Sequence, residues 1–255
     1  MKQLFYDALK RAAAARGVVI YRPQPNTVGE SHLKDIARLL AGVSQPVILD
    51  IGANEGQSIR DYQQTFPESL IHAFEPSPRT FAKLSQAAGV VLNNVGVGSV
   101  PGSLPLLEHE QSDMTSFLPP GAECWDSVDR TVQVPVTTVD RYCSEHGITH
   151  VHLLKTDTQG FDYEVLQGAD GLFQRSAVDL VMTEVTFADL YDGIPPLDVL
   201  YRFLADRQFR LVGIYHVFRY PDQSPIEWCD ALFVRTSSRQ VGSDLADRGS
   251  LRSRR

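Results

Sequence analysis

The chain has 255 residues, of which 43% are hydrophobic and 22% charged, and its net charge is −7. This composition is typical of a soluble globular protein and excludes a chain that is disordered throughout. The length suits one large α/β domain or two small ones. We expect no membrane partner, since every apolar run is shorter than a membrane span and the N-terminus lacks a signal peptide's apolar stretch.

The charge is unevenly distributed along the chain. Six Arg and two Asp lie from residue 235 onward, so the preceding residues carry −11. An acidic body argues against a nucleic-acid-binding face. The polar tail at 236–255 is predicted to be disordered, and a solvated end is favoured over contact with RNA or a membrane. Three widely separated cysteines favour reduced thiols in the cytoplasm over a disulfide framework.

The first third of the chain alternates helices and strands. We expect an N-terminal helical cap over 1–45, with helices at 1–16 and 31–42, which could pack against a second copy in a homo-oligomer. Strands are predicted at 47–51, 70–76 and 90–98. Helices are predicted at 57–66 and 77–89, the latter with Ser77 as its N-cap and Pro78 at its first position.

Residues 102–136 change character and read as short strands and loops. Regular alternation then returns, with strands at 150–157 and 178–185 and helices at 161–169 and 196–207. Two final strands, at 209–217 and 226–235, have no helix-length segment between them and should be antiparallel neighbours at an edge. The predicted fold class is therefore α/β and Rossmann-like, with about seven mostly parallel strands and helices on both faces. The domain would run over 46–235.

Polar residues follow the strands of this predicted sheet. In such a sheet, ligands bind beyond the carboxyl ends of the strands. The residues delivered to that edge are Asp50, Gly52, Asn54, Gly56, Glu75, Asn93, Asn94, Gly96, Lys155, Asp157, Glu184 and His216.

The stretch VILDIGANEGQS, residues 47–58, indicates which ligand binds there. Its two glycines allow a sharp turn and close approach of a ligand to the backbone, and Glu75 stands where a carboxylate accepts both ribose hydroxyls of an adenosine. The G-x-x-x-G spacing differs from the G-x-G-x-x-G of dinucleotide sites. Carboxylates here would repel a pyrophosphate but attract a sulfonium and an ammonium. This favours S-adenosyl-L-methionine over NAD, although a tight turn without a ligand is the alternative.

Several segments together resemble the FkbM-type S-adenosylmethionine-dependent methyltransferases. They are VILDIGANEGQS, HAFEPSP, LNNVGVG, LVMTEV and the long segment that ends in LLKTDTQGFDYEVLQGA, spread over about residues 46–235. The family usually has an acid where Gln159 stands. The resemblance implies a class I methyltransferase fold and O-methyl transfer, often to sugars or natural products. The cofactor contacts expected here are Asp50, Gly52, Ala53, Asn54, Gly56, Ser58, Glu75, Pro76, Asn94, Val95, Gly96, Ser116 and Asp157.

Transfer of a methyl group to a hydroxyl requires a base or a metal to remove the proton. Asp157 is the leading candidate base, and Lys155 leaves the same face of its strand, so an ion pair between them is an equal alternative. Glu184 and His216 are the other catalytic candidates, although a surface role is favoured for His216. No metal is predicted. A magnesium site at Asp157 and Glu184 is disfavoured, and the stretch around His109 has no ligand spacing.

The sequence thus predicts an O-methyltransferase that uses S-adenosyl-L-methionine and acts on a small-molecule hydroxyl. An NAD-dependent oxidoreductase and a nucleotide-binding module without catalysis are the alternatives. The sequence does not specify the acceptor, because acceptor walls are built from loops.

Overall fold

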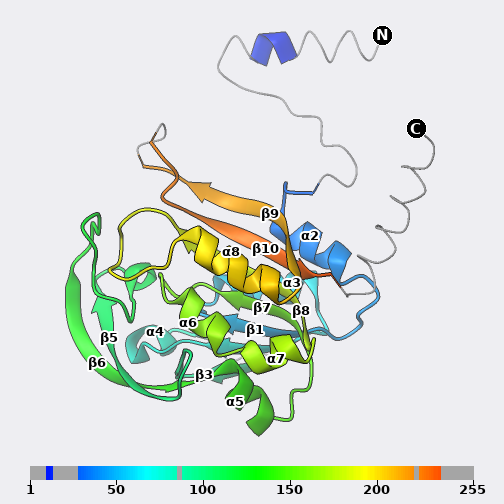
Figure 1. Ribbon diagram of the computed structural model, residues 1–255, viewed down its shortest axis with the longest axis horizontal. Coiled ribbons are helices and arrows are strands. Elements are labelled where there is room, and N and C mark those ends of the chain that lie inside the picture. The colour runs from blue at the N-terminus through cyan, green and yellow to red at the C-terminus, as the bar shows by residue number, and fades with distance from the viewer. Residues whose placement is uncertain (1–9, 14–27, 85–87, 221–223, 237–255) are drawn as a thin grey trace.

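The computed structural model describes residues 10–13, 28–84, 88–220 and 224–236, and its largest element is a seven-stranded sheet (Figure 1). The strands in spatial order are β3 (Val90–Asn93), β2 (Leu70–Phe74), β1 (Val47–Ile51), β7 (Val151–Thr156), β8 (Val178–Thr186), β10 (Trp228–Arg235) and β9 (Phe209–Phe218). β10 runs antiparallel to both of its neighbours, and the other pairings are parallel. This is the class I methyltransferase fold that the resemblance implies, so the predicted fold class is confirmed.

Helices cover both faces of this sheet, and its strands are therefore buried on both sides. The helices are α2 (His32–Leu39), α3 (Gln57–Thr65), α4 (Pro78–Phe81), α5 (Val139–Glu145), α6 (Asp162–Gln167), α7 (Asp170–Gln174) and α8 (Leu197–Asp206). Ile48 packs with residues of α2 and α3, whereas its neighbour Leu49 packs with residues of α5 to α8. Side chains alternate between faces along a strand, so β1 is the centre of two cores. Figure 1 shows α6, α7 and α8 together on one side of the sheet.

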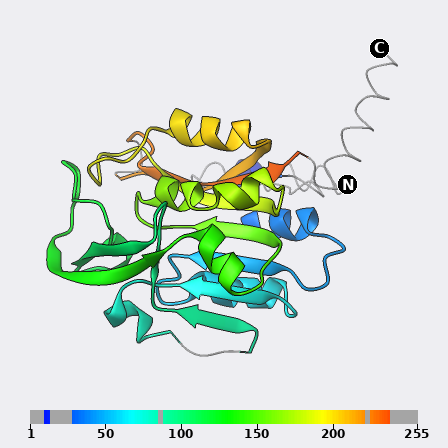
Figure 2. The ribbon, with the colours of Figure 1, turned by 60° about the horizontal axis from the view of Figure 1, so that its bottom comes forward.

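A second, three-stranded sheet corresponds to the irregular region predicted at 102–136. Its strands are β4 (Gly96–Val97), β6 (Val128–Thr137) and β5 (Gly102–His109), and a short 3₁₀ helix, η1 (Ser112–Met114), follows β5. Figures 1 and 2 show β5 and β6 beyond one side of the main sheet, at the left of both views. This second sheet positions the 112–117 segment over the carboxyl ends of β1, β2 and β7, where the segment contributes to a cavity wall.

Three predicted elements differ from the structure. The helix predicted at 77–89 ends at Phe81, after which Lys83 and Leu84 make i→i−3 bonds instead of continuing an α-helix. The strand predicted at 90–98 is split between the two sheets, because the Asn94 side chain donates to the Glu75 carbonyl at the point where a continuous strand would pass. The sequence did not lead us to expect α5 or α7.

The chain ends are described only in part. Residues 10–13 are helical, whereas the rest of the helix predicted at 1–16 and the tail after 236 lie outside the described residues. Among those described, no helix is both long and apolar enough to cross a membrane. All three cysteines are free thiols, as expected.

Candidate functional site

The turn after β1 is held by backbone hydrogen bonds to the next strand. The N–H groups of Gly52 and Ala53 both donate to the Phe74 carbonyl, at 3.0 and 2.9 Å. Gly52 has φ +83° and Asn54 has φ +45°. A Cβ on Gly52 would overlap the Asp157 carbonyl oxygen, so this glycine allows β1 and β7 to approach each other. The carboxyl ends of β1 and β7 therefore lie directly side by side at this edge of the sheet.

A buried ion pair lies under that turn. Asp50 is fully buried; its Oδ2 accepts a hydrogen bond from Ser58 Oγ at 2.5 Å, and its Oδ1 forms an ion pair with Lys155 Nζ at 3.0 Å. Lys155 also donates to the Gly52 carbonyl at 2.9 Å and faces Asp157 at 3.4 Å. Burial lowers the pKa of Lys155, but the two carboxylates hold it well above its ordinary value. Lys155 therefore stays an ammonium ion, and with Asp50 it supports the turn.

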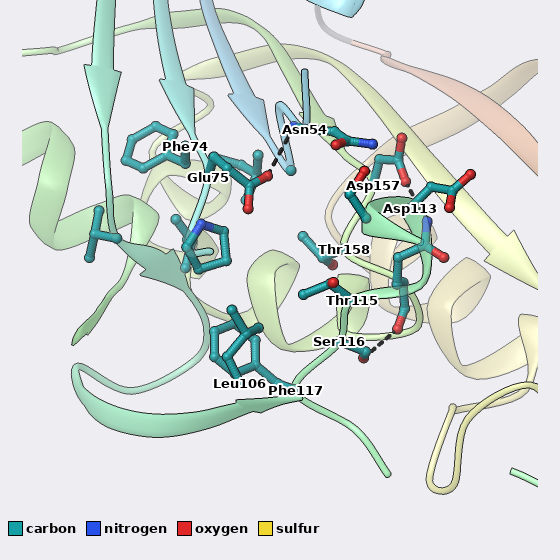
Figure 3. A pocket seen from close by; sticks show the side chains of 17 residues that line it. Asn54, Phe74, Glu75, Leu106, Asp113, Thr115, Ser116, Phe117, Asp157 and Thr158 are labelled. Carbon is teal, nitrogen blue, oxygen red and sulfur yellow. Dashed lines mark hydrogen bonds between the residues drawn. The ribbon is translucent and has the colours of Figure 1, made fainter. Parts of the chain in front are cut away.

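Glu75 provides the carboxylate at the end of β2. It is buried and accepts from the backbone N–H of Ser77 at 2.9 Å and from that of Asn54 at 3.0 Å, the latter bond being shown in Figure 3. Burial raises the pKa of Glu75 to about 7, although these two N–H donors lower it. The side chain nevertheless faces a cavity, where a further donor could satisfy it.

This cavity, of about 90 Å³, has a polar and an apolar wall and is called the smaller cavity below. Figure 3 shows Glu75 and Asn54 on one side and Leu106 and Phe117 across from them. The remaining residues of the lining are Ile51, Gly52, Phe74, Pro76, Val95, Val97, Ser112, Asp113, Thr115, Ser116, Asp157, Thr158 and Gln159. An apolar wall opposite a carboxylate suits a ligand that carries a flat ring beside hydroxyl groups.

The segment after η1 is tied to the end of β7. Ser116 Oγ donates to the Gln159 carbonyl at 2.7 Å, and Tyr191 donates to Gln159 Oε1 at 3.0 Å. Gln159 Nε2 in turn donates to Asp157 Oδ1 at 3.0 Å. An amide makes both of these bonds because it carries a donor and an acceptor. The residue that replaces the family's usual acid therefore links Asp157 to the 112–117 segment.

A larger cavity, of about 1040 Å³, opens on the other side of Asp157. It is lined by Asp113, Met114, Glu123, Trp125, Asp157, Gln159, Glu184, Thr186, Phe187, Ala188, Leu190, His216, Phe218, Tyr220, Ser224, Pro225, Ile226, Glu227, Trp228 and Asp230. A third cavity, of about 290 Å³, shares Asn54 with the smaller cavity, His216 and Asp230 with the larger one, and Asp157 with both. Asp157 thus stands where the three cavities meet.

Two titratable groups in the larger cavity have raised pKa values. His216, with φ +47°, has its Nδ1 2.6 Å from Asp230 Oδ2, and this hydrogen bond raises the pKa of the imidazole. Burial, followed by repulsion from Asp157 and other acids, raises the pKa of Glu184 well above its ordinary value. The cavity therefore contains two candidate proton acceptors.

The predicted cofactor residues fall into two groups, those that line a cavity and those that lie behind its wall. Gly52, Asn54, Glu75, Pro76, Val95, Ser116 and Asp157 line the smaller cavity, and Ala53 and Ser58 line the third cavity. Asp50, Gly56, Asn94 and Gly96 lie outside these walls. Gly56, with φ +80°, begins α3, and Gly96 packs under the Phe117 ring. The visible role of these four is structural, and all of the predicted cofactor contacts stay predictions.

Sequence reasoning missed three residues of the site. Leu106 on β5 and Phe117 in the segment after η1 form the apolar wall, but a single apolar residue carries no functional signal of its own. Asp230 was missed although it directly partners His216. The register of β9 on β10, which brings these two together, could not be read from the sequence.

One group of potential metal ligands occurs among the described residues, and it lies away from these cavities. His150, His152 and Asp179 have ligand atoms within 4.8 Å of one another at the amino ends of β7 and β8. His152 Nδ1 accepts from the Val47 N–H at 3.0 Å, which puts the ring proton on Nε2 and occupies both nitrogens. His150 is already hydrogen-bonded to Asp179 at 2.9 Å. The group is therefore poorly suited to bind a metal.

Comparison with known proteins identifies similar chains. A family model described as the methyltransferase FkbM domain matches residues 50–211, and the match ends before His216 and Asp230. The 2-O-methyltransferase NoeI of Sinorhizobium fredii is 27% identical over 183 residues, 66% of this chain and 74% of that protein. Methyltransferase 1 of Beauveria bassiana is 30% identical over 144 residues, 48% of this chain and 58% of that protein. A solved methyltransferase FkbM from Methylobacillus flagellatus has a TM-score of 0.46 at 15% identity, covering 81% of this chain and 48% of that chain.

Proposed function

This chain belongs to the methyltransferase FkbM family, and from that premise we propose that it uses S-adenosyl-L-methionine to methylate a hydroxyl group of a small molecule. The observation that carries the proposal is Glu75, a buried carboxylate that faces the smaller cavity from the end of β2. The similarity to a protein named 2-O-methyltransferase supports oxygen as the methylated atom. A cytoplasmic location, expected from the reduced cysteines, is part of the same proposal.

The residues of the smaller cavity fit this cofactor. Asn54 Oδ1 is buried and accepts no hydrogen bond from any described residue, so it is available to an ammonium group. The Glu75 carboxylate would accept from the ribose hydroxyls, and Phe117 and Leu106 would contact the adenine ring. Bound there, the cofactor would supply an electrophilic methyl group on a sulfonium. The carboxylate of Asp157, at the junction of the cavities, would attract the cationic end.

The acceptor hydroxyl would lie in the larger cavity and lose its proton to His216. Asp230 holds the Nδ1 side of this ring, which leaves Nε2 as the proton acceptor and stabilises the imidazolium that results. Both oxygens of Asp157, the leading candidate from the sequence, already have partners in Gln159 and Lys155. We therefore assign Asp157 to positioning and His216 to proton removal.

Calorimetry with S-adenosyl-L-methionine, S-adenosylhomocysteine and NAD tests the cofactor assignment. We expect binding of the first two only, weakened about 10- to 100-fold by Glu75→Gln, which removes a charged acceptor of two hydrogen bonds. Glu55→Gln is the matched control, since Glu55 is exposed, pairs with Lys83 and lines none of the three cavities. Binding of NAD alone would support the oxidoreductase alternative and reject the proposal.

Transfer of a labelled methyl group to a panel of sugars and hydroxylated natural products tests the reaction itself. The expected product is a methyl ether formed together with S-adenosylhomocysteine. Binding of cofactor without transfer to any member of the panel would favour the module without catalysis.

A further inference from the structure

The larger cavity has an unusual distribution of charge. Six carboxylic acids line it, namely Asp113, Glu123, Asp157, Glu184, Glu227 and Asp230. No lysine or arginine appears among its described lining residues, and its one basic side chain is His216, which is hydrogen-bonded to Asp230. A cavity of this kind attracts cations and repels anions before any specific contact is made.

Most of these carboxylates lack a cationic partner. Lys155 faces Asp157, and His216 faces Asp230. Within the described part of the chain, the other four, Asp113, Glu123, Glu184 and Glu227, form no ion pair. The negative charge is therefore not balanced by side chains of the cavity wall.

Glu184 is the most informative of the four. It is only 9% exposed, it lines the cavity, and its carboxylate accepts no hydrogen bond from any described residue. Its raised pKa reflects burial and repulsion from neighbouring carboxylates. A buried carboxyl group without a partner is costly. A ligand that brings a positive charge and donors to Glu184 would remove that cost.

The cavity also presents broad aromatic faces. Phe218 and Trp228 are stacked with ring centroids 5.0 Å apart, and Trp125 and Phe187 are 58% and 46% exposed although they line the cavity. Aromatic faces attract ammonium groups and pack against flat, partly apolar rings. Aromatic rings combined with carboxylates suit a hydroxyl-bearing ring that carries an amine.

We propose that the methyl acceptor is a cationic amino sugar, whose ammonium group binds at Glu184 and whose ring packs on the aromatic wall. This inference rests on the proposed O-methyltransferase function and narrows its substrate class. Acceptors with a carboxylate or phosphate, including sugar nucleotides, are rejected by the same carboxylates. A neutral sugar leaves Glu184 without a cationic partner and binds more weakly.

Three trisaccharides of similar size test the proposal by calorimetry: triglucosamine with its amines protonated, its fully N-acetylated counterpart, and trigalacturonic acid. We expect triglucosamine to bind about tenfold or more tightly than the N-acetylated form, and trigalacturonic acid not to bind. The preference should shrink as salt is raised, since salt screens the carboxylates. Equal affinities, tighter binding of the acid, or no binding of triglucosamine overturns the proposal.

Single substitutions test whether the preference for triglucosamine arises in the larger cavity. Glu184→Gln should reduce the ratio of the two affinities to about one, while Glu145→Gln, an exposed residue on α5, should leave it unchanged. Asp113→Asn is a second test on an exposed side chain whose replacement does not threaten folding, and it should narrow the ratio several-fold. An unchanged ratio in both cavity variants overturns the assignment to this site.

The two proposals can fail separately. Sugar binding is measured without cofactor, and cofactor binding is measured without sugar. Loss of the amine preference with intact S-adenosyl-L-methionine binding rejects the amino-sugar inference only. Absence of cofactor binding with the amine preference intact rejects the methyltransferase proposal and leaves an amine-binding cavity.

Discussion

The two sides of Asp157 are built in different ways. On the side of the smaller cavity, the turn after β1 is positioned by backbone hydrogen bonds and by glycines with positive φ. On the side of the larger cavity, the walls are side chains from β8, β9, β10 and the loops around residues 113–125 and 187–190. The first side depends on one short stretch and its neighbouring strands, and the second on segments far apart in the sequence.

This difference explains why the turn should tolerate fewer substitutions than the wall of the larger cavity. A backbone turn with a buried ion pair under it tolerates few substitutions, because every change alters the approach of β1 to β7. Side chains on a wide cavity wall can change one at a time without moving the sheet. The family match begins at the turn and covers the larger-cavity residues from Asp113 to Leu190, but it ends before His216 and Asp230.

The largest expected effect separates chemistry from cofactor binding. His216→Gln should lower kcat about 100- to 10,000-fold, because it removes the proton acceptor, and should leave the Kd of S-adenosyl-L-methionine unchanged. Steady-state kinetics with the acceptor found in the labelled-methyl screen measures the first, and calorimetry the second. His150→Gln, at the opposite end of the strands, is the control. A kcat close to that of the native protein would remove His216 from the mechanism.

The next largest effect concerns folding stability and a substitution in the turn after β1. Gly52→Ala should lower the free energy of unfolding by about 3 kcal/mol, since the new Cβ overlaps the Asp157 carbonyl and φ at this position is positive. Urea denaturation measures the change. Gly102→Ala is the matched control, because a Cβ there meets no atom within 4 Å. Equal stability of the two variants would contradict the packing account of the turn.

A smaller effect concerns the pH dependence of cofactor binding in the smaller cavity. Burial raises the pKa of Glu75 to about 7 in the folded protein. The free protein therefore loses stability as the pH rises from the ordinary pKa of a glutamate to about 7, because the unfolded chain releases this proton first. Ribose hydroxyls favour the ionised carboxylate, so cofactor binding should strengthen over the same range. We expect the Kd to be about tenfold weaker near pH 6 than near pH 8. Glu75→Gln should remove this dependence, and a persistent dependence would point to another group.

The smallest expected effect belongs to the wall of the larger cavity. Phe187→Ala should raise the KM for the acceptor about three- to tenfold through lost apolar contact, without changing the Kd of the cofactor. Leu211→Ala provides the control, since Leu211 is 42% exposed on β9 and lines none of the three cavities. If Phe187→Ala also weakened cofactor binding, the two sides would not be independent.

Much of the fold could be predicted because strands and helices show local periodicity. All seven strands of the main sheet had been located, although the third had been predicted too long. Ser77 caps its helix as expected, and Ser31 caps α2. The short helices α5 and α7, of seven and five residues, had not been predicted. The helix at α4 had been predicted to continue beyond Phe81, where Lys83 and Leu84 make i→i−3 bonds instead.

The sequence by itself determined the fold class, the family and the carboxyl-edge residues, because strand order and the glycine turn are encoded in short stretches. Only the tertiary structure decided which of those residues support the turn and which face a cavity. Asp50 and Lys155, equally polar in the sequence, form a buried support, whereas Glu75 faces a cavity. The pairing of His216 with Asp230 and the isolation of Glu184 depend on strand register and on the packing of distant loops. Charge and burial at a site come from what surrounds a side chain in space, which no local pattern specifies.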